Sequence, residues 1–345
     1  MSAPRQTGEF FLIEQIRKGM EGRYPPWVSR GIGDDCAILR PGEGTELIVT
    51  TDTMVEKIHF DLSWSSYAQV GGRVMAASLS DIAAMGGTPR GALLSCSLPA
   101  RRAEGVMELV RGVRELGDRY GCPLIGGDLT RSSQELFVNV TLLGEVDRGK
   151  ALCRSGAQEG DEIWVTGTLG GSQAGLNVLR FAPEVSQEAA QAVISRYLQP
   201  LPRLPEARYL AGLSALHSLI DLSDGLSSDL GHICSGSGLG ARLLAAALPI
   251  SPEVQEVARA LGEDPLAYAL NGGEDFELCL TAREGALGPW VESFRQRFAL
   301  PLTCVGRMVA GEGISLVGPG GEVQRLEPLG FDHFRGAISP ERSKD

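Results

Sequence analysis

The sequence predicts a mixed α/β fold, with helices and strands in layers, divided into two domains. The chain has 345 residues, which is enough for two domains of ordinary size. Each half contains apolar, β-branched segments typical of strands, and segments in between have the apolar spacing of helices. A polar, glycine-bearing stretch at 148–160 separates the halves. We therefore expect one domain at 1–148 and a second at 149–345.

The elements themselves alternate irregularly along the chain. Strand-like and helical segments do not repeat as uniform βαβ units, which favours α+β or loosely α/β layers. We expect strands at 46–53, 136–145, 162–167 and 276–281, helices at 67–85, 103–120, 186–199 and 203–213, and a further helix after Asp224.

Composition narrows the class of protein. The formal net charge is -11, which argues against a binder of nucleic acid or of anionic membranes. The seven cysteines are scattered and form no C-x-x-C pair, as expected of reduced intracellular thiols rather than a zinc site. The start of the chain lacks the pattern of a signal peptide, and no apolar run approaches the ~18 residues of a membrane span. We expect a cytoplasmic protein.

Glycine and aspartate occur together in short phrases. The chain has 45 glycines, and they include GIGDD at 31–35, GGD at 126–128 and GGED at 272–275. Glycine lets the backbone approach a ligand closely, so repeated glycine–aspartate turns predict a polar site built from loops. Any single phrase could equally be an ordinary turn.

Asp81 is the most informative carboxylate. It is the only charged residue between Arg73 and Arg90, and the helical segment around it is apolar on nearly every side. Such a helix is usually buried, so we expect Asp81 to be buried too. A buried carboxylate needs a partner or a metal ion. The alternative is a structural aspartate paired with the backbone or an arginine.

Further carboxylates follow predicted strands or lie in glycine turns. Each of them alone has a structural explanation as a cap or turn residue. Two carboxylates about 4 Å apart repel by roughly 4 kcal/mol at an effective dielectric near 20, so a converging group would need cations. Oxygen ligands without cysteine or histidine favour Mg²⁺ or Mn²⁺, and Mg²⁺ often completes its shell with phosphate oxygens. The set comprises Asp34, Asp35, Asp52, Asp128, Asp221, Asp224 and Asp229.

The common nucleotide-binding and hydrolase signatures are missing. The sequence contains no G-x-x-x-x-G-K-[ST] loop, no protein-kinase H-R-D or D-F-G element and no G-x-S-x-G elbow. The phrase GTLGGSQAG does not fit the dinucleotide fingerprint after a strand. Any nucleotide site must therefore have another architecture.

Taken in order, nine phrases resemble the thiamine-monophosphate kinase family, within the aminoimidazole-ribotide synthetase-like ATP-binding superfamily. The likeness runs over nearly the whole chain, and the combination of TTDTM with HF, RSGA and GGEDFEL narrows it to the kinases. The phrases are GEFFLIEQI (8–16), GIGDDCAIL (31–39), TTDTMVEKIHF (50–60), LSDIAAMGGTP (79–89), IGGDLTR (125–131), LCRSGAQEGDEIWVTGTLG (152–170), IDLSDGLSSDLGHI (220–233), NGGEDFELCLT (271–281) and GFDHF (330–334).

This resemblance implies an N-terminal α/β domain whose strands pair across a homodimer into a barrel, and a C-terminal α/β domain. ATP and several Mg²⁺ ions would bind in a cleft between them. The implied Mg²⁺ ligands are Asp35, Thr50, Thr51, Asp52, Asp81, Asp128, Asp221 and Asp224; the implied ATP contacts are Gly127, Asp128, Arg154 and Ser223; the implied catalytic residues are Asp128, Arg154 and Asp224.

The resemblance also implies how thiamine monophosphate would be held. His59 and Glu274 would contact it, with the Glu274 carboxylate facing the cationic thiazolium. Family members often carry an aromatic residue shortly before the terminal G-[YF]-D-H-F phrase, whereas this chain has Pro328 there, so ring packing should differ.

The expected reaction is transfer of the ATP γ-phosphoryl group to thiamine monophosphate, giving the diphosphate. Two other functions remain open. One is another enzyme of the superfamily, such as aminoimidazole-ribotide synthetase; selenophosphate synthetase would need a reactive N-terminal cysteine or selenocysteine. The other is a non-catalytic nucleotide-binding protein, which would bind ATP without turnover.

Overall fold

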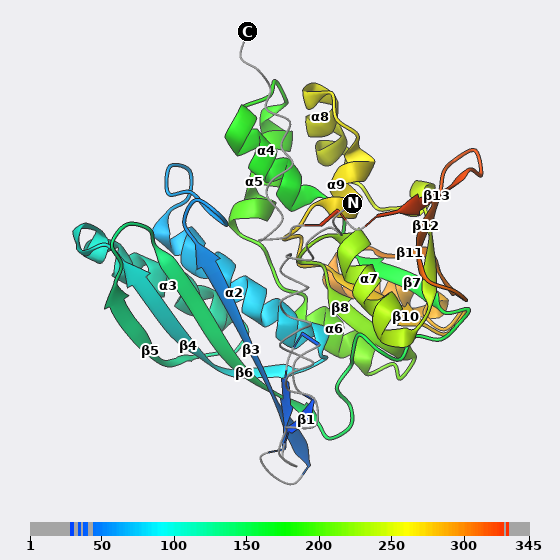
Figure 1. The fold of residues 1–345 in the computed structure, drawn as a ribbon, viewed down its shortest axis with the longest axis horizontal. Coiled ribbons are helices and arrows are strands. Elements are labelled where there is room, and N and C mark those ends of the chain that lie inside the picture. Colours follow the sequence, from blue (N-terminus) through cyan, green and yellow to red (C-terminus); the bar gives the residue numbers. More distant parts are fainter. Residues whose placement is uncertain (1–27, 31–33, 36, 41–43, 328, 331–345) are drawn as a thin grey trace, which may run out of the picture.

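The chain folds into two sheets joined by a central helix (Figure 1). The structure is a computed structural model, and it describes residues 28–30, 34–35, 37–40, 44–327 and 329–330. Within this part of the chain, no helix has the length and apolarity that crossing a bilayer requires.

The first sheet has six strands in the order β1-β2-β3-β6-β4-β5. β3 and β6 are antiparallel along their whole length, from Thr45 opposite Asp147 to Val55 opposite Phe137, whereas β5 runs parallel to β4. Two helices and a 3-10 turn accompany these strands. The elements are β1 (Val28–Arg30), β2 (Ala37–Leu39), β3 (Thr45–Val55), α2 (Tyr67–Ala84), β4 (Thr88–Leu98), η1 (Ala100–Gly105), α3 (Val106–Arg119), β5 (Leu124–Arg131) and β6 (Phe137–Asp147).

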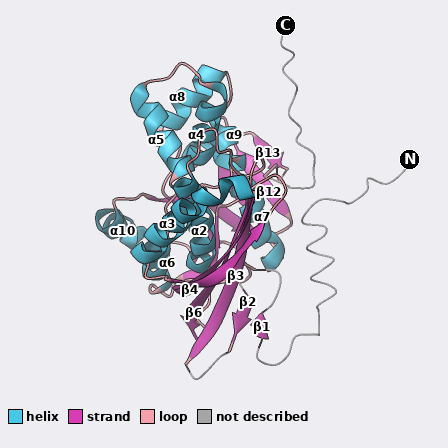
Figure 2. Cartoon of the chain, turned by 90° about the vertical axis from the view of Figure 1, so that its left-hand side faces the viewer, coloured by secondary structure: helices cyan, strands magenta, loops and turns pink. Residues whose placement is uncertain are grey.

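The two faces of this sheet differ in character. Successive strand residues point to opposite faces, and in β3 the even-numbered residues from Glu46 to Thr50 are buried against the helices. The opposite, open face carries polar side chains, with Asn139 donating to Thr51 at 2.8 Å. Figure 2 shows the helices gathered on one side of β3, β4 and β6. One face therefore belongs to the core, and no helix of the described chain covers the other.

The second sheet has seven strands in the order β13-β12-β9-β11-β7-β10-β8. It is mostly antiparallel, with β12 parallel to β9. Its elements are β7 (Glu162–Thr166), α4 (Gly171–Phe181), α5 (Gln187–Leu198), α6 (Leu204–Ala211), β8 (Leu216–Asp221), α7 (Leu226–Ser237), β9 (Gly240–Leu244), η2 (Ala245–Ala247), α8 (Pro252–Leu261), α9 (Pro265–Asn271), β10 (Leu278–Ala282), η3 (Gly288–Trp290), α10 (Val291–Phe298), β11 (Leu302–Val309), β12 (Gly313–Val317) and β13 (Val323–Leu326).

Helix α2 connects the two sheets through one apolar core. Ile48 and Leu142 of the first sheet, Leu79 of α2, and Leu219 and Leu278 of the second sheet all belong to the same buried cluster. A second cluster packs α7 against the other face of the second sheet, and a third joins α4, α5 and α8. The side chains of α2 are therefore held from both parts of the molecule.

The mixed α/β fold in two parts is as the sequence predicts, and the nine expected elements are present with shifted ends. The expected helix at 103–120 begins as the 3-10 turn η1, and Asp128 lies inside β5 instead of following a strand. The proposed boundary between 148 and 149 falls in the connection between β6 and β7 and remains a prediction. Sequence reasoning missed β1, β2, β4, β8, β9, β11 to β13, α8, α9 and α10.

Candidate active site

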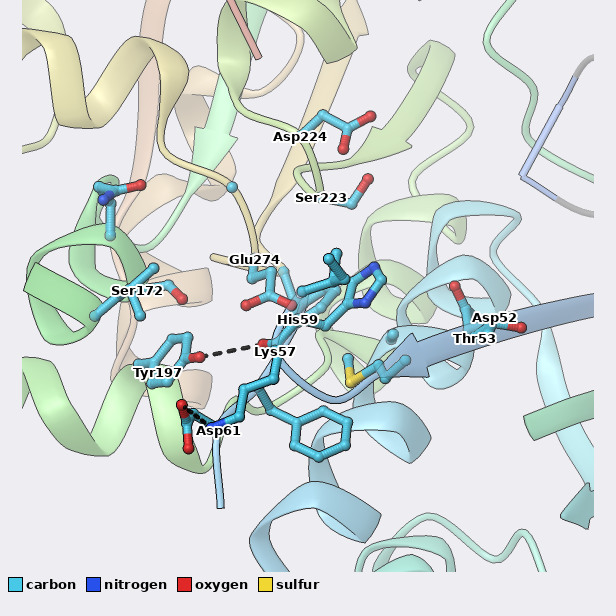
Figure 3. A pocket seen from close by; sticks show the side chains of 18 of the residues that line it. Asp52, Thr53, Lys57, His59, Asp61, Ser172, Tyr197, Ser223, Asp224 and Glu274 are labelled. Atoms are coloured by element: carbon cyan, nitrogen blue, oxygen red, sulfur yellow. Dashed lines mark hydrogen bonds and ion pairs between the residues drawn. The ribbon is translucent and has the colours of Figure 1, made fainter. Parts of the chain in front are cut away.

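A cavity of about 590 Å³ lies where the two parts of the molecule meet (Figure 3). The first part contributes the end of β3 and the loop from Lys57 to Asp61, and the second contributes α4, Tyr197 and the loops 223–224 and 271–276. Ala77 of α2 also lines it. A volume of this size suits a small ligand or a nucleotide.

Three carboxylates converge beside this cavity from distant parts of the sequence. Oxygen atoms of Asp35, Asp81 and Asp221 all lie within 4.8 Å of one another. Asp81 comes from α2 and Asp221 from the end of β8, whereas Asp35 precedes β2. Asp81 is partly exposed, although the sequence predicts it to be buried; its helix neighbours Ser80 and Ile82 are buried. The predicted convergence of carboxylates is therefore present.

Asp52 and Thr50 extend the cluster from β3. Being two residues apart on the strand, they face the same side, toward α2. Thr50 Oγ1 donates a hydrogen bond to Asp81, and Ser78 Oγ of α2 donates to Asp52 Oδ2 at 2.8 Å. Asp52 also lines the cavity, so it links the buried carboxylates to the open space.

The electrostatics of this cluster favour a bound cation. Burial, and next the neighbouring Asp35 carboxylate, raises the pKa of Asp221 to about 8. Burial likewise raises the pKa of Asp52 to about 6, and burial together with Asp52 raises that of Asp81. Protons are held because several negative charges share a site with little solvent.

The residues present fit a divalent metal ion with oxygen ligands. Oδ2 of Asp35 and Oδ2 of Asp221 are buried, and neither has a hydrogen-bond partner in the described chain. A buried carboxylate oxygen without a donor is costly, and a cation would offset that cost. Among the residues that the structure describes, neither histidine nor cysteine belongs to the group, which matches the preference of Mg²⁺ for hard oxygen ligands.

Arg154 supplies a fixed positive charge at the edge of the cluster. Its guanidinium forms an ion pair with Asp35, and its backbone N–H donates to Asp34 Oδ1 at 3.3 Å. Arg154 lies in the connection between the two sheets, and about a quarter of its side chain is exposed. It is therefore placed to meet an anionic group approaching the carboxylates.

The loop with Ser223 and Asp224 is shaped by a buried aspartate. Oδ2 of Asp229 accepts the backbone N–H groups of Ser223, Asp224 and Gly225 at 3.0–3.1 Å. Ser223 and Asp224 themselves line the cavity. Asp229 lies in the first turn of α7 and is 2% exposed, so it acts on the loop and does not reach a ligand.

Each acidic residue of the GGEDFE phrase has a different environment. Glu274 lines the cavity. Asp275 accepts the N–H groups of Gly170 and Ser172 at 2.5 and 3.0 Å, and so caps the start of α4. Glu277 is fully buried, where Arg203 donates to it through Nε and Nη2 at 2.8 and 2.6 Å.

The Glu274 and Ser223 loops are held against each other by their backbones. Glu274 N–H donates to the Ser223 carbonyl at 2.8 Å. Gly273 must be a glycine here, because a Cβ would lie 2.6 Å from that same carbonyl oxygen. The two loops therefore form one unit.

His59 is oriented by the backbone on either side of its loop. Its Nδ1 accepts the Val55 N–H at 3.0 Å, so the neutral ring carries its proton on Nε2. The His59 carbonyl accepts from the Tyr197 hydroxyl at 3.2 Å, as Figure 3 shows, and from Arg73 Nη2 at 3.1 Å. A donor on a fixed imidazole thus lines the same cavity as Glu274.

Comparison with known proteins shows to which family the chain belongs. Residues 33–146 match the model of the AIR synthase related protein N-terminal domain, and residues 158–318 match that of its C-terminal domain. The thiamine-monophosphate kinase of Escherichia coli K12 is 40% identical over 329 residues, which are 95% of this chain and 98% of that protein. The chain belongs to the thiamine-monophosphate kinase family.

Solved structures agree with that membership. The complex of AaThiL with AMPPCP and TMP has a TM-score of 0.83 and 32% identity, over 97% of this chain and 99% of that one. Escherichia coli HypE, a hydrogenase maturation protein, has a TM-score of 0.70 at 21% identity, over 91% of this chain and 96% of that one. At that identity HypE shares the fold alone.

Three residues that the thiamine-monophosphate kinase resemblance implies as ligands lie apart from the cluster. Thr51 faces the open side of the first sheet, where its hydroxyl accepts from Asn139. Asp128 is exposed on β5, opposite Ser95, and three strand spacings (about 14 Å) separate β5 from β3. Gly127 is its neighbour on β5. A single chain therefore does not bring these three to the cavity.

The remaining implied residues divide clearly. Five of them meet in the cluster: Asp35, Thr50, Asp52, Asp81 and Asp221. Arg154 borders the cluster. Four others line the cavity: His59, Ser223, Asp224 and Glu274. Pro328, the position of the thiamine-monophosphate kinase aromatic residue, lies outside the described residues, although its neighbour Leu329 lines the cavity.

Sequence reasoning missed two residues that hold the Glu274 and His59 loops, Arg73 and Tyr197. Arg73 had a detectable signal, because it lies eight residues before Asp81 on the same helical stripe. Tyr197 had none, since its partners lie far away in the sequence. Asp229 was recognised as one of several carboxylates, but its role in holding a loop depends on contacts that only the fold creates.

Proposed function

We propose that this protein phosphorylates thiamine monophosphate to thiamine diphosphate with ATP, by direct in-line transfer that depends on Mg²⁺. The observation that carries the proposal is that the carboxylate cluster reaches, through Asp52, the same cavity that Glu274 and His59 line. In the AaThiL complex, the relative binds AMPPCP and TMP together.

The charges of the two substrates match the two ends of the cavity. Phosphate groups would lie toward Asp52 and Asp224, which line the cavity and would help to hold Mg²⁺. The cationic thiazolium would lie toward Glu274, whose carboxylate stabilises positive charge. His59 would donate a hydrogen bond from Nε2.

The chemical step needs positioning more than proton transfer. The acceptor phosphate is already an anion near neutral pH, so no strong general base is required. Mg²⁺, when bound, neutralises the charge that develops on the transferred phosphoryl group. Arg154 would bind the phosphate chain of ATP, and Asp229 would hold Ser223 and Asp224 in the conformation that meets it. The metal ligands we propose are Asp35, Thr50, Asp52, Asp81, Asp221 and Asp224.

We further propose that two chains pair through the open face of the first sheet to form a barrel. That face also carries exposed apolar side chains, with Leu93 37% and Ile125 56% exposed. β5 also has an unpaired edge, which is a template for pairing with another strand. Gly127, Asp128 and Thr51 would act at this interface, where ATP and its metal ions approach the partner.

A cytoplasmic location is part of the same proposal. Six cysteines lie in the described chain, and all six are free thiols. Reduced cysteines are typical of intracellular proteins.

The first test is product formation from ATP and thiamine monophosphate, with and without Mg²⁺, resolved by chromatography. Magnesium-dependent thiamine diphosphate with stoichiometric ADP supports the proposal. Asp81→Asn and Asp224→Asn should abolish turnover while circular dichroism stays native, and Asp264→Asn, a surface helix cap, serves as the matched control. ATP binding without thiamine diphosphate would point to another phosphate acceptor, and activity retained in both variants would refute the ligand assignment.

A further inference from the structure

Arg73 is a fully buried arginine between the two parts of the molecule. Its side chain is 0% exposed and extends from α2 to the loop of Glu274. Nη2 donates to Glu274 Oε2 at 2.6 Å and to the His59 carbonyl at 3.1 Å. The guanidinium also stacks on the Tyr197 ring, 4.1 Å from its centroid. One side chain therefore contacts both residues to which we assign thiamine monophosphate.

Stability alone does not account for this arginine. A buried ion pair often contributes no more to folding than well-packed apolar residues of the same volume. Nε and Nη1 of Arg73 are buried without a hydrogen-bond partner in the described chain, which adds a further cost. Its neighbours along α2, such as Val70, Val74 and Ala77, are apolar and buried. A guanidinium in this setting is best explained by what it holds in place.

The backbone that Arg73 contacts is strained. Glu274 has φ +62° and Phe276 has φ +49°, and Lys57, near His59, has φ +70°. The described chain has six non-glycine residues with positive φ, and these three line the cavity. Such conformations persist only where the surroundings determine them, and they gather at ligand sites. Arg73 joins both strained loops through one rigid group.

The helix also fixes the distance between the two ends of the cavity. Arg73, Ala77 and Asp81 follow one another at four-residue intervals, so they lie along one side of α2. At 1.5 Å per residue, Arg73 and Asp81 are about 12 Å apart along the helix axis. Ala77 lines the cavity between them. Asp81 belongs to the carboxylate cluster and Arg73 to the Glu274 end.

We propose that Arg73 is a positioning residue that holds Glu274 and the His59 loop at a fixed distance from the carboxylate cluster. Glu274 Oε2 is occupied by Arg73, so Oε1 is the atom that meets the cationic ring of the substrate. The helix α2 thereby sets how far the ring lies from the acceptor phosphate. This inference rests on the proposed function, because it assigns thiamine monophosphate to the Glu274 end.

The test compares Arg73→Met and Arg73→Lys with the wild-type enzyme. Arg73→Met should raise KM for thiamine monophosphate by about tenfold or more, since misplacing a substrate by ~1 Å can cost as much as 10²-fold. KM for ATP should change less than about twofold, because Arg73 contacts none of the residues assigned to ATP. Arg73→Lys retains the charge without the planar guanidinium that stacks on Tyr197, and its KM should lie between those of wild type and Arg73→Met.

A double-mutant cycle separates positioning from a general loss of structure. If Arg73 acts through Glu274, adding Arg73→Met to Glu274→Gln should raise KM for thiamine monophosphate far less than it does in the wild type. Arg114→Met, an exposed substitution on α3, is the matched control and should leave both KM values unchanged. Calorimetric binding of thiamine monophosphate gives a second readout that is independent of turnover. Should Arg73→Met fail to fold, Arg73→Lys carries the same comparison.

The outcomes separate a failure of this inference from a failure of the proposed function. A KM for thiamine monophosphate within about twofold of wild type in both Arg73 variants would overturn the inference, as would equal rises for both substrates or full additivity with Glu274→Gln. A wild-type enzyme that makes no thiamine diphosphate and does not bind thiamine monophosphate would instead refute the proposed function.

Discussion

Replacing Asp229 by alanine tests whether the metal-side loop is held by one buried carboxylate. The side chain accepts three consecutive backbone N–H groups, from Ser223, Asp224 and Gly225, at 3.0–3.1 Å. Its carboxylate is almost completely buried. Alanine removes the acceptor while leaving α7 a good helix-forming residue.

The size of the effect follows from how well water can replace the carboxylate. The Gly225 N–H is buried, and an orphaned buried donor costs about 1–3 kcal/mol. The other two donors are partly buried, and each should lose about 0.5–1.5 kcal/mol. Removing a negative charge near Asp221 and Asp224 relieves some repulsion, so we expect a net loss of about 3 kcal/mol. That corresponds to a fall in Tm of about 6–12 °C for a domain of this size.

Asp229→Asn should lie between alanine and the wild type, because an amide oxygen accepts in the same place but forms weaker bonds than a carboxylate. Urea unfolding gives the stabilities, and KM for ATP at fixed Mg²⁺ reports the loop, which should bind several-fold more weakly. Asp264→Ala is the control, since it loses one exposed helix-cap bond worth about 1 kcal/mol. Unchanged stability and unchanged KM for ATP in Asp229→Ala would show that the three hydrogen bonds do not hold the loop.

Two further predictions concern buried charge. Glu277→Gln should destabilise the protein by about 3–5 kcal/mol in urea unfolding, because it leaves Arg203 buried without its carboxylate. The control is Glu284→Gln, which alters the exposed pair with Arg307 and should change the free energy of unfolding little. Equal losses of stability in both variants would refute the distinction between buried and exposed pairs. Burial raises the pKa of Asp52 to about 6 and that of Asp221 to about 8. From about pH 4 up to these values, the folded protein therefore binds more protons than the unfolded chain. Without metal, the stability of the folded protein should fall as pH rises through this range. The rise in Tm on adding Mg²⁺ should therefore be larger at pH 8 than at pH 6, and an equal rise at both would contradict a metal bound at these carboxylates.

Many of the helices and strands, and most residues of the carboxylate cluster, could be predicted from the sequence because both depend on local patterns. Asp81 stood out as the only charged residue between Arg73 and Arg90, and its helix is indeed central to the core. The glycine–aspartate phrases predicted loops that gather at a site, and Asp224 lies in such a loop, just after Asp221 at the end of β8. These features follow from periodicity and residue chemistry along a few turns of chain.

The GGEDFE phrase marks where such reasoning ends. Its three acidic residues are close in sequence, yet Glu274 lines the cavity, Asp275 caps α4 and Glu277 pairs with Arg203. Positive φ at Glu274 and at Phe276 turns successive side chains in directions that no regular strand would give. A motif alone could not assign these separate tasks.

The sequence by itself determined the family, the mixed α/β class and the identity of the candidate carboxylates, because each can be recognised from short segments of the chain. The tertiary structure decided which of those residues meet: Asp35, Asp81 and Asp221 converge, whereas Asp128 lies on the open side of the first sheet. It also revealed that Arg73 holds Glu274, across 201 positions of sequence. The physical reason is that contacts between distant segments depend on how whole helices and sheets pack, and local sequence carries no record of that packing.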